Sequence, residues 1–132
     1  MKLTFFKASE LESNVKATVH LNGRLGFNKN AEKRLDLENV KSVKIAKSED
    51  YEKDKTLYLL TQEDTDNDGF SVLKAGEYYY ATTKTLFDAL AEDYEKTKII
   101  YDISEVEYEG EKIFRLKRRD IERKKNEKED ME

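Results

Sequence analysis

An alternating segment followed by a tight-turn pair limits the folds open to this chain more than any other feature. Apolar residues stand at every second position of 15–21, with polar residues between them, which is typical of a strand with one buried face. Asn22 and Gly23 come next, and Asn-Gly is the strongest short-range indication of a β-hairpin. With a return strand expected at 24–27, the first third of the chain should be built on antiparallel sheet.

The elements predicted around this hairpin occur twice along the chain. Asn28 is a good N-cap for a helix, and strands should follow at 43–45 and 57–60. The second series comprises strands at 70–73 and 78–80, a helix capped by Thr82 or Thr83, and strands at 99–108 and 113–116. A turn at Glu109-Gly110 should join the last two strands.

Two local alignments relate the halves of the chain. LNGRLGF at 21–27 aligns with KAGEYYY at 74–80, and TLYLLTQED at 56–64 aligns with KIFRLKRRD at 112–120. We therefore predict an α+β, mostly β fold: a small barrel-like core built from two ββαββ repeats, about 15–63 and 70–119, with pseudo-twofold symmetry. A single domain should cover 1–119, and the highly charged residues 120–132 should form a frayed or disordered tail.

Composition excludes several classes of function. The 132 residues include no cysteine and a single histidine, His20, which excludes disulfides, thiolate metal sites and multi-histidine metal cages. The lack of cysteine fits a reducing compartment, and the chain has no signal-peptide pattern and no apolar run long enough for a membrane helix. No hydroxyl or carboxylate pair stands in a recognisable catalytic pattern. We expect a cytoplasmic, non-enzymatic protein with no cofactor and no membrane partner.

Charge is unevenly distributed along the sequence. The formal net charge is −4, but residues 1–45 are net basic, residues 46–110 strongly acidic and residues 111–132 slightly basic. For a nucleic-acid binder the local field matters more than the total charge. The basic first third is therefore the part of the chain best suited to a polyanion, although an uneven but solvated surface would give the same pattern.

An acidic segment imitates the first half of a calcium-binding loop. Asp64, Asp66 and Asp68 stand at alternate positions before Gly69, as in an EF-hand loop. The second half departs from the motif, since Ala75 stands where the bidentate glutamate belongs. A solvated connector between strands is the favoured interpretation, with weak Ca²⁺ binding as the alternative.

Two further features concern the second half of the chain. Arg115, Lys117 and Arg119 share one strand face, and a register placing Glu107 opposite Arg115 and Glu105 opposite Lys117 would neutralise most of it. The basic residues left over as weaker candidates for a polyanion are Arg118, Arg119, Lys124 and Lys125.

Tyr78–Tyr80 put aromatic rings on both faces of one strand, either for core or dimer packing or for base stacking.

The first half resembles the AbrB-like swapped-hairpin family of regulators (SpoVT/AbrB proteins). The resemblance lies in the run Gly23-Arg24-Leu25-Gly26-Phe27-Asn28, in Leu35-Asp36-Leu37 and in Val43-Lys44-Ile45. The second half would be a degenerate copy, as in tandem MraZ-type regulators, with Glu77 in the arginine position. In this sequence Asn28 replaces the family's usual proline, and Asp36 replaces its glycine.

The resemblance implies an intertwined barrel that meets DNA near its second strand and first helix. Residues carried over on this basis are Arg24 as the matching arginine, with Lys29, Lys33 and Arg34 around the helix. The first hypothesis is thus a DNA-binding regulator that binds duplex through these four residues. The second is a protein–protein interaction module on the same fold, such as a homodimer, without DNA binding. A third is a single-strand binder using Tyr78–Tyr80 and the C-terminal basic residues.

Overall fold

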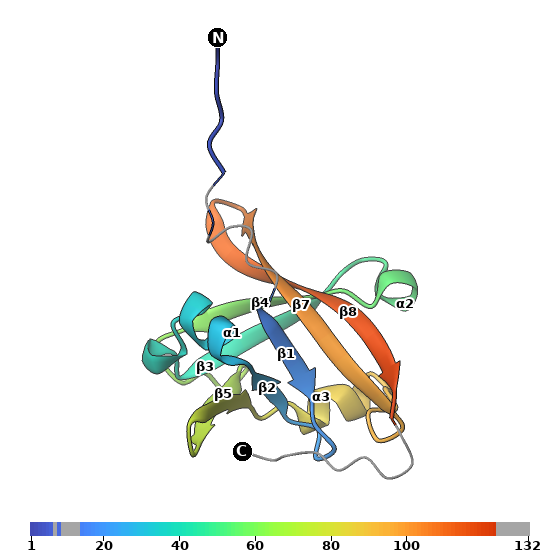
Figure 1. Ribbon diagram of the computed structural model, residues 1–132. Helices are drawn as coiled ribbons and strands as arrows, with labels where there is room; N and C mark the ends of the chain where they lie inside the picture. Colours follow the sequence, from blue (N-terminus) through green and yellow to red (C-terminus); the bar gives the residue numbers. More distant parts are fainter. Residues whose placement is uncertain (7, 9–13, 124–132) are drawn as a thin grey trace.

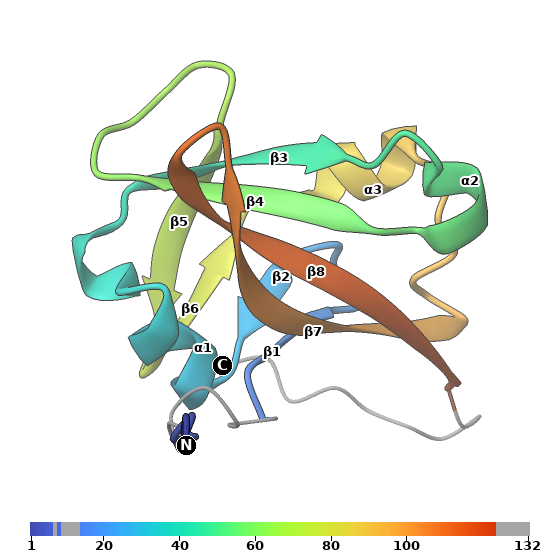
Figure 2. The same cartoon turned by 90° about the horizontal axis from the view of Figure 1, so that it is seen from above.

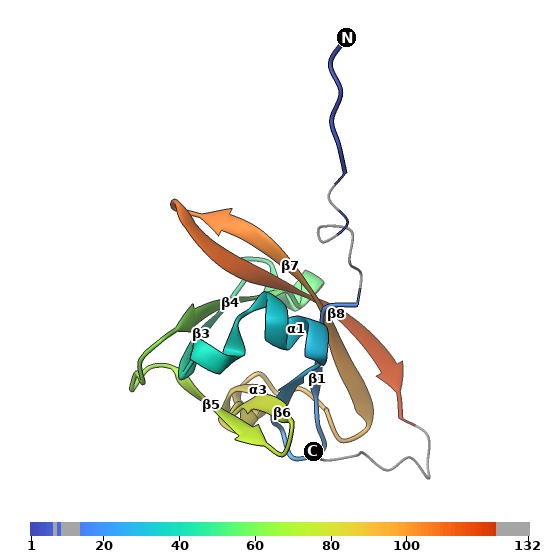
Figure 3. The ribbon, with the colours of Figure 1, turned by 60° about the vertical axis from the view of Figure 1, so that its left-hand side comes forward.

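Eight antiparallel strands close into a barrel in the part of the chain described by the computed structural model, which covers residues 1–6, 8 and 14–123 (Figures 1 and 3). The order around the barrel is β1-β2-β6-β5-β3-β4-β8-β7, and β7 pairs back with β1. The strands are β1 (Lys16–Val19), β2 (Leu25–Phe27), β3 (Ser42–Lys47), β4 (Leu57–Gln62), β5 (Phe70–Ala75), β6 (Tyr78–Ala81), β7 (Thr97–Tyr108) and β8 (Glu111–Glu122). The predicted mostly β, barrel-like core is confirmed.

The Asn-Gly pair forms a hairpin with a three-residue loop. Val19 lies opposite Leu25, and the His20 N–H donates to the Arg24 carbonyl at 2.8 Å. Gly23 donates its N–H to the His20 carbonyl and has a φ of +82°. A turn that ends in a left-handed residue is a common three-residue hairpin loop, and glycine adopts that conformation without steric cost.

The core consists of the side chains that point into the barrel, which come from every second position along the strands. Leu25, Leu59 and Leu116 are buried completely, and each comes from a different strand. Phe87, from the helix that follows β6, is also fully buried, and its ring centroid lies 6.4 Å from that of Tyr101 in β7. The core therefore joins residues that are distant in the sequence.

Short helices connect the strands at the two ends of the β3–β4 pair (Figure 2). They are α1 (Lys29–Arg34), the 3-10 helix η2 (Leu37–Asn39), α2 (Tyr51–Asp54) and α3 (Lys84–Ala89). The Asn28 side chain accepts a hydrogen bond from the Ala31 N–H at 2.9 Å, so the predicted N-cap is confirmed. No helix within the described ranges is long and apolar enough to cross a membrane.

Thr83 occupies the N-cap position of α3 but does not cap it. No side-chain capping hydrogen bond is formed there. Its buried hydroxyl instead donates to the Gly23 carbonyl at 2.9 Å. This hydrogen bond therefore connects the start of α3 with the β1–β2 loop.

The predicted register of the long hairpin is wrong. Tyr108 lies opposite Glu111, and both turn residues have positive φ, 50° at Glu109 and 80° at Gly110, which is the geometry of a two-residue type I′ turn. This turn fixes the register, so that Glu107 faces Lys112 and Glu105 faces Phe114. The predicted register would have needed a longer loop.

One boundary and one alignment predicted from the sequence also differ from the structure. The charged tail was expected to begin at 120, but β8 continues to Glu122, and residues 124–132 lie outside the described part. The residue alignment of the two halves does not preserve the faces of the strands. It matches Leu59, which is fully buried, with Arg115, which is exposed, because shifting a strand by one position exchanges its two faces.

Candidate nucleic-acid interface

The outer face of β1, β2 and β6 carries a hollow of about 180 Å³. Thr18 lies opposite Gly26, and Gly26 lies opposite Tyr80, so these three residues form a row across the strands. A Cβ atom at Gly26 would collide with the imidazole of His20. Because Gly26 has no side chain, the His20 ring can lie directly over the strand at this point, where it helps to line the hollow.

Arg24 forms one wall of this hollow. Its guanidinium carbon lies 4.3 Å from the centroid of the Tyr80 ring, within the range of a favourable cation–π contact. Among the described residues, Arg24 forms no ion pair with a carboxylate. Its charge is therefore held in place by a ring but is not neutralised by an anion.

Lys29, the first residue of α1, lies beside the same hollow. Its ammonium nitrogen donates to the Glu77 carbonyl at 2.6 Å and lies 5.1 Å from the centroid of the Tyr78 ring. It also pairs with Glu32 at 3.5 Å, while 49% of the lysine side chain stays exposed. The cap at Asn28 fixes where α1 begins and so places this lysine next to β6.

The four residues carried over from the family resemblance do not form one cluster. Arg24 and Lys29 both lie over tyrosine rings of β6, Arg24 over Tyr80 and Lys29 over Tyr78. Lys33 is exposed on the far turn of α1. Arg34 lines a different hollow, next to Asp36 and Lys112 near the β7–β8 hairpin.

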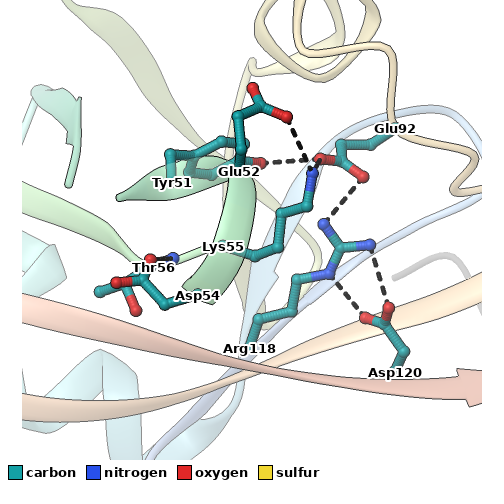
Figure 4. A network of polar contacts seen from close by, with 8 residues as sticks. All are labelled: Tyr51, Glu52, Asp54, Lys55, Thr56, Glu92, Arg118 and Asp120. Carbon is teal, nitrogen blue, oxygen red and sulfur yellow. Dashed lines mark hydrogen bonds and ion pairs between the residues drawn. The ribbon is translucent and has the colours of Figure 1, made fainter. Parts of the chain in front are cut away.

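A second group of cations lies at the end of the barrel next to α2 (Figure 4). Arg118 points inward, with 9% of its side chain exposed, and pairs with Glu92 at 2.8 Å and with Asp120 at 2.6 Å. Tyr51 donates its hydroxyl to Glu92 at 2.9 Å, and Lys55 pairs with the same carboxylate at 3.4 Å. We call these five residues the Glu92 network.

The Glu92 network stabilises the charged form of its carboxylate. Burial by itself would raise the pKa of Glu92, but the contacts with Arg118 and Tyr51 outweigh burial, and that pKa lies below its ordinary value. Burial and the hydrogen bond to Glu92 raise the pKa of Tyr51 above its usual range. Two carboxylates of the chain therefore already neutralise Arg118, which makes it a poor candidate for contact with an added anion.

The other C-terminal candidates lie in different surroundings. The Arg119 Nε atom donates to Asp102 at 2.6 Å on the outer face of the β7–β8 pair. Lys124 and Lys125 lie outside the described residues. None of the C-terminal basic residues that the structure describes reaches the hollow beside Tyr80.

The acidic loop is held by its own hydrogen bonds. Asp66 accepts from the Asp68 N–H at 2.8 Å and from the Gln62 amide at 3.2 Å, and these contacts lower its pKa. Lys44 lies 3.4 Å from the same carboxylate. In the ranges that the structure describes, no three acidic or histidine side chains gather as a metal site, so Asp64, Asp66 and Asp68 are not arranged as ligands of one ion.

The contact between Arg24 and the tyrosine run is not predicted from the sequence. The pairing of β2 with β6 brings them together, and no local pattern indicates that pairing. The role of Arg118 could have been found, because it shares its strand parity with the buried Phe114 and Leu116. Glu92 gave no local signal, since it follows α3 in an irregular segment.

Comparisons with known proteins found no relative of this chain: no family model, no curated protein and no solved structure matches it.

Proposed function

We propose that this chain is a non-enzymatic DNA-binding protein of the AbrB-like swapped-hairpin type, and that Arg24 and Lys29 are its principal DNA contacts. The observation that carries the proposal is the guanidinium of Arg24, which is held 4.3 Å over Tyr80 on an open face without a carboxylate partner among the described residues. A positioned but unneutralised arginine is suited to phosphate or base contacts.

The charge distribution supports this choice of face. Arg24 and Lys29 belong to the basic first third of the sequence, and the ammonium of Lys29 is anchored by a backbone carbonyl. Two basic residues of β8, by contrast, are paired with carboxylates: Arg118 with the buried Glu92, and Arg119 with the partly exposed Asp102. Among the described residues, Arg24 can therefore meet a polyanion without giving up a carboxylate partner, whereas Arg118 and Arg119 would have to give one up.

The proposal includes a barrel of two ββαββ units. Exchanging β1–β4 for β5–β8 reproduces the same strand order around the barrel. The helices α1 and α3 each have six residues, and each is followed by a leucine and then by a residue with positive φ, Asp36 or Ala91. A chain carrying two copies of residues 14–69 should then unfold cooperatively, and a non-cooperative melt would count against the two-unit origin.

The test of DNA binding is a fluorescence anisotropy titration with labelled random duplex and single-stranded DNA at two salt concentrations. We expect binding at about 50 mM salt with micromolar protein, weakening as salt rises because phosphate contacts release counterions. Arg24→Ala should weaken binding at least fivefold. The matched control is Lys47→Ala, an exposed lysine at the end of β3 next to α2, which should bind like the wild type. Absence of binding to both DNAs would overturn the proposal.

A protein–protein interaction module is the second candidate, and apolar exposure on the same side of the barrel favours it. Leu73 lies opposite Tyr80 and is 47% exposed, and Tyr78 is 38% exposed. A homodimer formed through this face would cover both. Light scattering decides the point: a dimer that Leu73→Asp converts to a monomer supports the module, and a concentration-independent monomer contradicts it.

A further inference from the structure

We infer that the hollow beside Tyr80 takes a single-stranded nucleic acid, with one base stacked against the Arg24–Tyr80 pair and a second on Tyr78. This inference rests on the proposed function and narrows its ligand. It assigns a binding role to the tyrosines and the neighbouring cations together.

The hollow is the wrong shape for a duplex reader. Proteins read the major groove with a projecting helix or a two-stranded ribbon, whereas this site is a depression lined by His20, Arg24 and Tyr80 among other residues. The adjacent helix α1 has only six residues. In a duplex the faces of the bases are covered by their neighbours, so that tyrosine rings on a sheet cannot stack on them without intercalation.

The spacing of the rings points to separated bases. Tyr78 and Tyr80 stand two positions apart on β6, which places their Cα atoms about 6.7 Å apart on an extended strand. That distance is about twice the 3.4 Å rise between stacked nucleotides in one DNA strand. Neighbouring bases that occupied both rings would have to be unstacked from each other, which single strands permit.

Each ring has a cation over one of its faces. Arg24 lies over Tyr80, and the ammonium of Lys29 lies 5.1 Å from the centre of the Tyr78 ring. Aromatic side chains and arginine planes both serve as stacking platforms for unpaired bases, and a nearby positive charge can meet the phosphate. The pairing of rings and cations is therefore suited to a base and its phosphate at two successive positions.

The small number of cations gives a quantitative expectation. With Arg24 and Lys29 as the main phosphate contacts, the logarithm of affinity should fall with the logarithm of salt with a slope of roughly −1 to −2, given about −0.7 per contact on single strands. A protein tracking a duplex through six or more phosphates would show a slope steeper than about −5. The slope thus separates the two modes without a mutation.

The decisive experiment compares three labelled DNAs of equal length with the full chain: oligo-dT, an abasic strand with the same phosphates, and a duplex. We expect oligo-dT to bind at least fivefold more tightly than the abasic strand, since stacking on an aromatic residue is worth about that much or more per base. The duplex should bind more weakly than oligo-dT. Tyr80→Ala should remove the preference for oligo-dT, and Tyr80→Phe should restore it.

A matched control is Tyr108→Ala, which removes an exposed tyrosine at the tip of the β7–β8 hairpin and should leave all three affinities unchanged. Thermal melts of each variant will show whether the barrel is intact. Equal binding of the abasic strand and oligo-dT, or tighter binding of the duplex, would overturn the single-strand inference while leaving DNA binding in place. Failure to bind any of the three would overturn both.

Discussion

The barrel holds two groups in which cations lie beside tyrosines, and they differ in what neutralises the charge. In the Glu92 network, Arg118 is almost fully buried and meets two carboxylates. On the β1–β2–β6 face, Arg24 meets the ring of Tyr80 and no carboxylate of the described part. The same residue types thus form an internal structural cluster in one place and an open face in the other.

The difference follows from desolvation. A buried charge must be compensated by nearby opposite charge and hydrogen bonds, because removing it from water is costly. A partly exposed arginine such as Arg24 keeps part of its hydration, and an aromatic ring is then sufficient to hold its position. Counting basic residues in the sequence therefore does not indicate which of them can meet a ligand, whereas the number of internal carboxylates around each one does.

The largest effect should come from breaking the Glu92 network. Arg118→Met leaves Glu92, which is 8% exposed, without its closest cation, and removing one partner of a buried pair costs about 3 kcal/mol or more. Urea unfolding should show a loss of that size. The adjacent variant Lys117→Met, on the exposed face of the same strand, should cost less than about 0.5 kcal/mol. Equal stabilities of the two variants would contradict the structural role of Arg118.

A smaller effect should distinguish two buried tyrosines, Tyr51 within the Glu92 network and Tyr101 outside it. Tyr51→Phe removes a hydrogen bond to a charged carboxylate and should cost about 1.5 kcal/mol. The Tyr101 hydroxyl is buried without a hydrogen-bond partner among the described residues, so Tyr101→Phe should be neutral or slightly stabilising. Thermal denaturation of the two variants provides the measurement. A loss at Tyr101 as large as that at Tyr51 would show that its hydroxyl has a partner.

The smallest effect on stability is expected for a substitution on the β1–β2–β6 face. Arg24→Ala removes a partly exposed cation–π contact and should lower the free energy of unfolding by about 0.5 kcal/mol, while reducing DNA affinity at least fivefold. Both quantities should be measured on one preparation. Arg118→Met should show the opposite pattern, with a large loss in the free energy of unfolding and little change in DNA affinity. A loss of stability near 3 kcal/mol for Arg24→Ala would show that this arginine belongs to the fold rather than to the site.

Local patterns predicted most of the strands but few of their partners. The alternation at 15–21 and the Asn22-Gly23 pair correctly indicated the first hairpin, and Asn28 was identified as a helix cap. The register predicted for β7 and β8 from charge pairing is wrong, because the two positive-φ residues of the turn at Glu109-Gly110 set the pairing. A turn acts on neighbours in the sequence and is the stronger constraint on register.

In the candidate site, too, the sequence indicates the residues but not the contacts between them. Arg24, Lys29 and the tyrosine run each stood out in the sequence, but the β2–β6 pairing that joins them spans more than fifty residues, and no local pattern encodes it. Glu92 and Arg118 meet for a similar reason, since one follows α3 and the other lies in β8. Contacts of this kind depend on how the barrel closes.

The sequence by itself determined the β-rich class, the first hairpin and the helix start at Asn28, because alternation, turn chemistry and capping act within a few residues of the chain. Tertiary structure alone decided which cations face outward. Barrel closure turns Arg118 toward Glu92 and brings Arg24 over Tyr80, and the burial of a charge depends on the whole surrounding surface rather than on its neighbours in the sequence.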